Sequence, residues 1–368
     1  QRQMCIRDSG SGSVFIGRNA GLNSNIIDSQ GSENWGSAYI GQDSGVNSKG
    51  DGNIYMGSSA GINHQGSQNI FLGDGARNLK DQQGSDENEI TKGNRNIAIG
   101  NQYVHNPAKV YRKKYGEDDA LNDTITIGTG TRASANGAIA IGSAYDYGYD
   151  DKLQRTYYTA TAANGVSSIA LGSGILVNSK NGVAVGFGSS IVDDKVTDAV
   201  ALGSYSQATT KALDANTKNV YLGNNAEVAA TAASTKGAIS VGSEKDGLDE
   251  NKKTVKPFTR QITNLAAGTQ DADAVNVAQL KAGIKNVVKY DSDANDKITL
   301  SGLDNANPKV AGGVTITNLK AGDVSKNSKD AINGSQLHAT NESIKQNTDK
   351  ITKNEGDITT INQKLDGF

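Results

Sequence analysis

The 368-residue chain has few of the residues that build a thick globular core. It contains one cysteine, three prolines, one tryptophan and five phenylalanines, and only 35% of its residues are hydrophobic. The lone Cys5 excludes an intrachain disulfide, and no run of about 18 apolar residues predicts a membrane-spanning helix. A net charge of -2 gives no electrostatic basis for binding nucleic acid. These scarcities exclude a disulfide scaffold, a helical membrane protein and a nucleic-acid partner.

Residues that would indicate catalysis or metal binding are also scarce. The three histidines, His64, His105 and His338, are far apart in the sequence, and none belongs to a metal-binding or nucleophile motif. The acidic run Asp291–Asp296 lacks the glycine and the glutamate that a calcium loop needs, so we interpret it as a polar hairpin turn. We therefore predict no enzymatic activity, no metal site and no required cofactor.

Glycine is abundant, and it closes a short tetrad that recurs twelve times. In each tetrad an aliphatic residue, any residue and a second aliphatic residue precede the glycine. Such a short repeat is typical of a solenoid, whose stacked coils share one narrow core. Because side chains alternate along a strand, we expect the aliphatic pair to face this core and the middle residue to face away. The tetrads begin at Val14, Ala38, Ile54, Ile70, Ile97, Ile125, Ile139, Ile169, Val183, Val200, Val220 and Ile239.

The middle residue of the tetrad changes character along the chain. It is aromatic in the first four copies and alanine, serine or threonine in most later ones. An outward aromatic stripe would be costly in water, and a stripe of small residues suits close contact with another flat surface. We therefore expect solenoids to associate side by side.

Polar insertions at 74–96, 101–124 and 143–168 interrupt the tetrads, and eight of the thirteen tyrosines lie in the last two. Tyrosine is enriched on recognition surfaces, although these residues have the alternative role of local packing. If they pack locally, the repeat face around 183–206 is the better candidate for binding. The candidate ligand-binding residues are Tyr145, Tyr147, Tyr149, Tyr157, Tyr158, Val183, Val185, Val200 and Ser206.

A longer motif occurs twice after the tetrads. Ile262–Gly268 is followed by Asp273–Leu280, and Ile316–Gly322 is followed by Asp330–Leu337. Both copies resemble the neck of trimeric autotransporter adhesins, the YadA-like bacterial surface proteins, and tetrads such as the one in Asn181–Ser189 resemble that family's head repeats. The resemblance implies a homotrimer of left-handed β-rolls whose necks join neighbouring subunits. The expected neck contacts are Ile262, Leu265, Val275, Leu280, Ile316, Leu319, Ile332 and Leu337.

The C-terminal residues follow a heptad pattern that predicts a coiled coil over 341–368. Leu337, Ile344, Ile351, Ile358 and Leu365 are seven residues apart, and the second core position holds Asn347 and Asn354. The resemblance implies that three copies of Asn347 turn inward around an anion such as chloride, and that Asn354 forms a similar site. A buried water, or an asparagine that only fixes the register, are the alternatives.

The predicted fold class is mainly β: a left-handed parallel β-roll head that forms a homotrimer, then necks, a small β-domain and a trimeric coiled coil. The resemblance implies an adhesin on the bacterial cell surface that binds a host matrix protein, a cell-surface receptor or other bacteria. It also implies an outer-membrane anchor beyond Phe368. A polysaccharide-cleaving β-solenoid and a ligand-free spacer are the alternatives. The predicted domains are a non-native tail (1–9), the head (10–245), the first neck (246–282), the small β-domain (283–312), the second neck (313–340) and the stalk (341–368).

Overall fold

Two compact units make up the computed structural model, Gln1–Asn264 and Leu265–Phe368. Of the elements that the structure describes, the first unit contains the strands and the second contains the two longer helices. The structure describes residues 12–25, 36–76, 91–100, 120–150, 155–213, 225–248, 254–285, 287–292, 294–298, 300 and 315–367.

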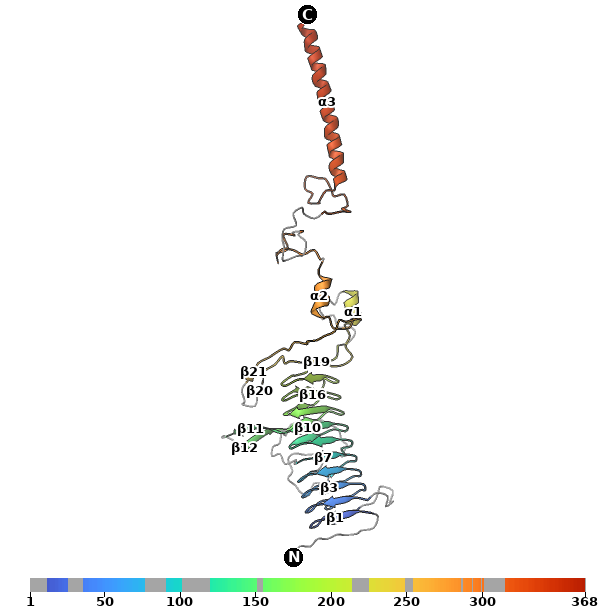
Figure 1. Ribbon diagram of the computed structural model, residues 1–368, viewed down its shortest axis with the longest axis vertical. Coiled ribbons are helices and arrows are strands. Elements are labelled where there is room, and N and C mark those ends of the chain that lie inside the picture. The colour runs from blue at the N-terminus through green and yellow to red at the C-terminus, as the bar shows by residue number, and fades with distance from the viewer. Residues whose placement is uncertain are drawn as a thin grey trace. The chain divides into compact units, whose positions relative to one another are not determined.

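The tetrads form one long parallel sheet, in which each strand pairs in register with the same positions of the next coil (Figure 1). Ile139 lies opposite Ile169, for example, and Ile141 lies opposite Leu171. Eleven of the twelve tetrads are strands of this sheet, and the twelfth, at 220–223, lies outside the described residues. In sheet order the strands are β1 (Val14–Ile16), β2 (Ala38–Ile40), β3 (Ile54–Met56), β5 (Ile70–Leu72), β7 (Ile97–Ile99), β8 (Ile125–Ile127), β10 (Ile139–Ser143), β14 (Ile169–Ser173), β16 (Val183–Val185), β18 (Val200–Leu202) and β19 (Ile239–Ser240).

Short parallel strands form a second wall in several of the coils, and the described residues also contain two antiparallel hairpins. These stacked coils, which we call the roll, confirm the predicted mainly β class with parallel sheets. The second wall consists of β4 (His64–Gln65), β6 (Thr91–Lys92), β9 (Thr131–Ala133), β13 (Thr161–Ala163), β15 (Leu176–Val177) and β17 (Ser190–Ile191). The hairpins are β11 (Tyr145–Asp150) with β12 (Arg155–Thr159), and β20 (Gly247–Leu248) with β21 (Thr254–Val255); the unit also holds the short helix α1 (Ala226–Thr231).

The side chains of the tetrads point the opposite way from our expectation. In the first ten strands of the long sheet, which run from β1 to β18, the middle residue of the tetrad is buried, and its two aliphatic neighbours are partly or largely exposed. The prediction that the aliphatic pair forms the core was therefore wrong. Each coil closes so tightly that only one side chain of the strand fits inside. A Cβ atom at Gly45, for instance, would lie 2.5 Å from the Tyr39 ring, at a backbone φ of +65° that already favours glycine.

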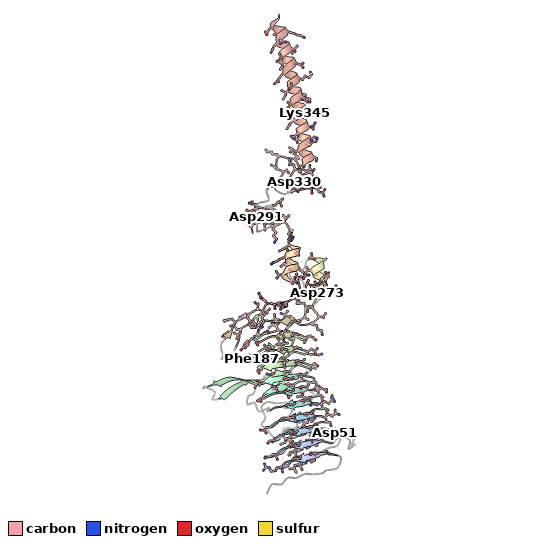
Figure 2. All side chains as sticks on the ribbon, viewed as in Figure 1. Asp51, Phe187, Asp273, Asp291, Asp330 and Lys345 are labelled. Carbon is pink, nitrogen blue, oxygen red and sulfur yellow. The ribbon has the colours of Figure 1, made fainter. Side chains whose placement is uncertain are left out.

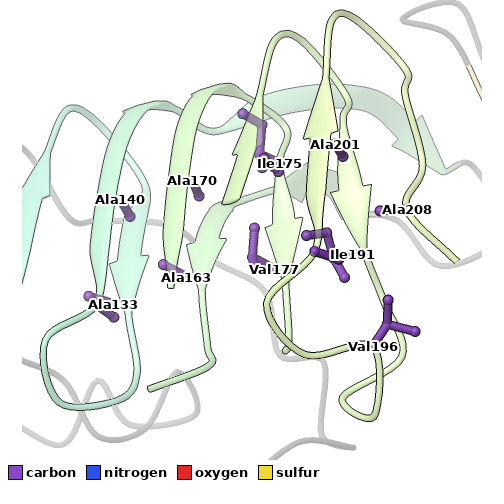
Figure 3. Packing of buried hydrophobic residues seen from close by; sticks show 13 residues of the cluster. Ala133, Ala140, Ala163, Ala170, Ile175, Val177, Ile191, Val196, Ala201 and Ala208 are labelled. Atoms are coloured by element: carbon purple, nitrogen blue, oxygen red, sulfur yellow. The ribbon is translucent and has the colours of Figure 1, made fainter. Parts of the chain in front are cut away.

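The interior has an aromatic half and an aliphatic half. Phe15, Tyr39, Tyr55 and Phe71 stack as a column, with successive ring centroids 5.0, 4.8 and 5.0 Å apart. Beyond this column the tetrads contribute only small residues, and the second wall and the segments beside it supply the larger side chains instead (Figure 3). The change from aromatic to small middle residues therefore reflects which part of the coil fills the core. These residues are buried, so they do not form the outer surface that we expected them to form. The larger side chains are Ile175, Val177, Ile191 and Val196.

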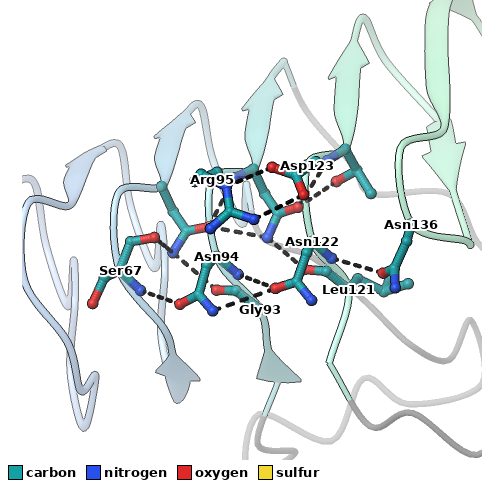
Figure 4. Close-up of polar contacts among 11 residues, drawn as sticks. Ser67, Gly93, Asn94, Arg95, Leu121, Asn122, Asp123 and Asn136 are labelled. Atoms are coloured by element: carbon teal, nitrogen blue, oxygen red, sulfur yellow. Dashed lines mark hydrogen bonds and ion pairs between the residues drawn. The ribbon is translucent and has the colours of Figure 1, made fainter. Parts of the chain in front are cut away.

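Buried polar ladders fix the register between coils. The side-chain oxygen of Asn53 accepts hydrogen bonds from the backbone N–H and the amide of Asn69, both at 3.0 Å, and Asn69 and Asn96 are joined in the same way. A second, half-buried ladder joins Asn94 and Asn122 (Figure 4). Because a buried amide left without partners is costly, a shift by one coil is strongly disfavoured.

The second unit is built on two helices, α2 (Val277–Gly283) and α3 (Gly334–Asp366). Helix α3 contains the predicted heptads, but it begins before residue 341, within the predicted second neck. Around the acidic run the Asp291 N–H donates to the Lys297 carbonyl at 2.8 Å, which forms the expected turn. None of the residues described between 287 and 300 is a strand, so a small β-domain remains a prediction.

Candidate adhesion and assembly surfaces

The insertion with the most tyrosines contains the antiparallel hairpin β11–β12, which leaves the roll between β10 and β13 (Figure 1). We call residues 145–159 the hairpin arm. Its register pairs Tyr145 with Thr159 and Asp150 with Arg155, with an irregularity between Asp146 and Gly148. The side chains of the arm, including all five candidate tyrosines, lie outside what the structure describes. Their backbone is brought together in one hairpin, as the binding hypothesis requires.

The base of the hairpin arm is fixed to the roll by several hydrogen bonds. The Ser143 and Ser173 hydroxyl oxygens lie 2.7 Å apart, and Thr161 Oγ1 lies 2.8 Å from both the Ser143 and the Gly172 carbonyl oxygens. The Ala144 N–H donates to the Thr129 carbonyl at 2.7 Å. The arm therefore departs from a defined point on a rigid scaffold, which is how proteins usually present binding loops.

The second group of candidates, on the repeat face, is only partly available to a ligand. Val183, Val185 and Val200 flank buried middle residues and are partly exposed. Ser206 is fully buried, and its hydroxyl donates to the Leu202 carbonyl and accepts from Arg260, both at 2.8 Å. Ser206 is therefore withdrawn as a ligand contact, because its hydroxyl is already committed inside the roll.

The outward aliphatic residues form a continuous stripe along the long sheet, which we call the aliphatic face. Val14, Ile16, Ile54, Met56 and Leu202 are each between 38% and 48% exposed in the single chain. A contiguous apolar surface of this kind marks a site of association. The aliphatic face thus supports the expected side-by-side association of solenoids. The small middle residues do not support it, because they are buried.

Each neck contains a compact arrangement of hydrogen bonds, which we call the neck clasp. In the first, Gln279 accepts from the Gly268 N–H and donates to the Gly268 carbonyl, both at 2.9 Å. Asn276 caps helix α2 through the Gln279 N–H at 3.0 Å and donates to the Leu265 carbonyl at 3.2 Å. A Cβ at Gly268 would lie 2.8 Å from Asp273 Cβ, so the tight approach requires glycine.

The acidic residue of the first neck holds the loop before helix α2. Asp273, labelled in Figure 2, accepts hydrogen bonds from the Thr269 and Gln270 N–H groups at 2.8 and 3.0 Å. These bonds, that of Thr269 first, lower the pKa of the Asp273 carboxyl below its usual value. The carboxylate thus fixes the loop before helix α2 through these two bonds.

The second neck repeats this geometry with Gln336, Gly322, Asn333 and Leu319. Sequence reasoning quoted both motifs but did not recognise these polar residues as their structural centre. The signal was present, because asparagine followed three residues later by glutamine is the pattern of a helix capping box.

The apolar neck residues expected at subunit contacts are all exposed in the single chain. The core positions of the heptad in α3 are also exposed, from Ile344 to Leu365, as are Asn347 and Asn354. An isolated helix with so many exposed apolar side chains would be marginal in water.

His64 is a buried residue that sequence reasoning set aside. Its Nε2–H donates to the Gly93 carbonyl at 3.0 Å, and its Nδ1 lies 2.7 Å from the Thr91 hydroxyl oxygen. Its ring makes edge contacts with Tyr55 and Phe71. Burial lowers the pKa of His64 to about 4, against the smaller opposing effect of the Gly93 bond. The residue therefore supports the core in its neutral form.

Within the described residues there is no group of histidine, cysteine, aspartate or glutamate side chains that fits a metal ion. No helix in the described part of the chain has the length and apolar character needed to cross a membrane.

Parallel coils with an exposed aliphatic face in one unit, and capped helices with exposed apolar side chains in the other, define a protein built from repeats. The family model described as the coiled stalk of trimeric autotransporter adhesin matches residues 261–299 and 315–360. The resemblance of its motifs to the trimeric autotransporter adhesins is thereby confirmed over the necks and the stalk.

Two relatives and one solved structure also match parts of this chain. Trimeric autotransporter adhesin AtaA of Acinetobacter sp. (strain Tol 5) is 39% identical over 123 residues, which are 30% of this chain and 3% of AtaA. Autotransporter adhesin EhaG of Escherichia coli O157:H7 is 32% identical over 119 residues, which are 32% of this chain and 7% of EhaG. The collagen-binding domain of Yersinia adhesin YadA is 20% identical with a TM-score of 0.25, and the match covers 60% of this chain and 85% of that domain. The chain thus spans a small part of the length of these two relatives.

Proposed function

We propose that this chain is the head, neck and upper stalk of a bacterial surface adhesin, and that the hairpin arm contributes to ligand binding. The match to adhesin stalks over both necks supports the adhesive function. The hydrogen-bonded base of the arm supports its role, because it presents a tyrosine-rich segment from a rigid roll. The ligand class that we propose is a host matrix protein or cell-surface receptor, with the protein held in the outer membrane outside the region described.

We propose that the working form is a homotrimer. The aliphatic face, the apolar neck residues and the heptad positions of α3 are all exposed in one chain, and burial against two further copies would cover them. The β-branched Ile344, Ile351 and Ile358 at one core position suit a coiled coil, with partly polar residues at the other. Light scattering of the intact chain is expected to give three chains per particle, whereas a folded monomer at micromolar concentration would contradict the proposal.

Shortening the hairpin arm should separate binding from folding. Replacing residues 145–158 by a tight turn is expected to leave the melting temperature and trimer mass nearly unchanged, because the arm lies outside the roll. The same change should lower adherence to immobilised matrix proteins, such as collagen, fibronectin and laminin, by about tenfold or more, since recognition tyrosines typically dominate such contacts.

A matched control is the replacement of Tyr205 by serine, which alters an aromatic pair on the roll while leaving the arm intact. Equal adherence by the shortened and parent proteins would mean that the tyrosines of the arm serve local packing. The repeat face around 183–206 would then be the better candidate for ligand binding. Cleavage of a polysaccharide panel by the parent protein would favour the enzymatic alternative.

We also propose that Asn347 binds an anion on the three-fold axis of the stalk. Three inward amides can point their N–H groups at one halide, which would satisfy side chains that otherwise lower the stability of the coiled coil. Replacing Asn347 by isoleucine should raise the melting temperature of the stalk and abolish a bromide anomalous peak at this position. The Asn354→Ile variant serves as the comparison, because that residue is followed by Glu355 and departs from the motif. An axis that holds only water would contradict the anion proposal and leave the coiled coil intact.

A further inference from the structure

Each coil of the roll satisfies the backbone carbonyls of the coil before it. The N–H of the tetrad glycine donates to the carbonyl of the third tetrad residue in the preceding coil, as the Gly203 N–H does to the Val185 carbonyl at 2.8 Å. A second bond forms two residues after that glycine. There the N–H donates to the residue that directly follows the tetrad glycine of the preceding coil, as the Tyr205 N–H does to the Phe187 carbonyl at 2.7 Å. Among the described residues no coil follows that of β19, and just after its glycine Ser243 pairs with Phe258 and not with the coil before it. The carbonyls at this end of the stack therefore form the open edge of a sheet.

Arg260 occupies this open edge. Its Nη2 donates to the Ser204 carbonyl at 2.7 Å, and its Nη1 donates to the Val241 carbonyl and to the Ser206 hydroxyl. Ser204 directly follows the glycine of its tetrad, and Val241 is the third residue of the final tetrad. These are the two carbonyl positions that a following coil satisfies elsewhere in the roll.

The guanidinium is held in place by a segment that folds back over the end of the roll. We call the described residues 243–248 and 254–260, which hold the hairpin β20–β21, the strap. The Ser243 and Phe258 backbones exchange two hydrogen bonds of 3.0 Å. The Arg260 Cζ atom lies 4.6 Å from the centroid of the Phe258 ring. On the roll side lies Gly203, where a Cβ would come within 3.2 Å of the Arg260 Cζ atom.

We propose that Arg260 is the end cap of the β-roll, a guanidinium that replaces the missing next coil and blocks the sheet edge against strands of other chains. Arginine suits this role because its planar fork carries five donors and no acceptor. A lysine ammonium on its flexible stem does not reproduce the fixed spacing of the two nitrogens. An uncapped edge of parallel coils is a template for pairing with another molecule.

The test uses the full chain and the Arg260→Met variant, which keeps an apolar stem but removes every donor. Hydrogen exchange in the last two coils, over residues 200–207 and 238–243, is expected to rise by about tenfold or more, because bonds to a charged group are lost. Exchange in residues 97–100, far from the edge, should stay unchanged. Light scattering should also show particles larger than the parent's, since the freed edge is expected to pair.

The matched control is Lys256→Met, which breaks an exposed ion pair with Asp246 in the same strap and should alter neither readout. Parent-like exchange at residues 200–207 in the Arg260→Met variant would overturn the proposal. If that variant loses its strand signal altogether, Arg260→Lys decides the question. Faster exchange with lysine supports the planar cap, and full protection by lysine overturns it.

Discussion

Acidification from pH 7 to about 4 is expected to remove about 3 kcal/mol of the stability of the roll through His64 alone. The pKa of this residue falls from 6.5 to about 4 on burial, and each unit corresponds to about 1.4 kcal/mol. Because the folded pKa is the lower one, the contribution is fully present above pH 6.5 and is lost as the pH falls through 4. The proton is taken up more readily by the unfolded chain than by a ring enclosed beside Tyr55 and Phe71.

The measurement is chemical denaturation of the parent and the His64→Thr variant across this pH range, followed by the circular dichroism of the strands. Threonine is the natural choice, because Thr91 occupies the paired position in the next coil. The variant should be less stable at neutral pH but should lose less stability on acidification, by about the 3 kcal/mol given above. His338→Gln, at an exposed position of α3, is the control and should follow the parent. Identical pH profiles for parent and His64→Thr would show that His64 is not the acid-sensitive group.

The largest effect of a single substitution is expected within the aromatic column. Tyr55→Ala should cost about 3–5 kcal/mol of unfolding free energy, because the fully buried ring is stacked between Tyr39 and Phe71 and its loss leaves a cavity. Each coil contacts mainly its neighbours, so the loss should fall on the first half of the roll. Denaturation midpoints, with hydrogen exchange to locate the opening, would measure both the size and the place of the effect.

Tyr55→Phe is the matched control for this experiment. The Tyr55 hydroxyl is buried without a hydrogen-bond partner among the described residues, and the next coil carries phenylalanine at the same position. Its removal should therefore leave stability unchanged or slightly increased. A loss similar to that of Tyr55→Ala would show that the hydroxyl, and not the stacked ring, stabilises the column.

The sequence allowed the strands to be located but not the direction in which their side chains point. Alternation of side chains shows that a strand has two faces, but it does not show which face is buried. In a strand of three residues with an aliphatic residue at each end, either face could pack into the core. Phe15, Tyr39 and Tyr55 held the missing information, because the bulkiest apolar residue of each early tetrad is the one that water disfavours most. The outcome depended on coil width, which glycines such as Gly45 set through contacts that only the folded chain reveals.

The candidate sites divide in a similar way. The neck clasps were predictable in principle, because Asn276 and Gln279 have the spacing of a capping box. His64 was not, since a lone histidine has no motif, and its environment is created by stacking beside Thr91 and Phe71. Arg260 likewise lies 54 residues from Ser206, and only the return of the strap brings the two together.

The in-register stacking of the coils also determines how the roll responds to mechanical load. Strands run across the stack, so the hydrogen bonds between coils point along it, from β1 towards β19. A force that pulls β1 and β19 apart therefore acts on the hydrogen bonds of each coil-to-coil contact in turn. Because these contacts are in series, each one carries the whole force. Under tension the roll gives way first at its weakest joint. The final joint pairs only Val200 with Ile239 and Ala201 with Ser240, and Arg260 of the strap adds hydrogen bonds to the Ser204 and Val241 carbonyls at this joint.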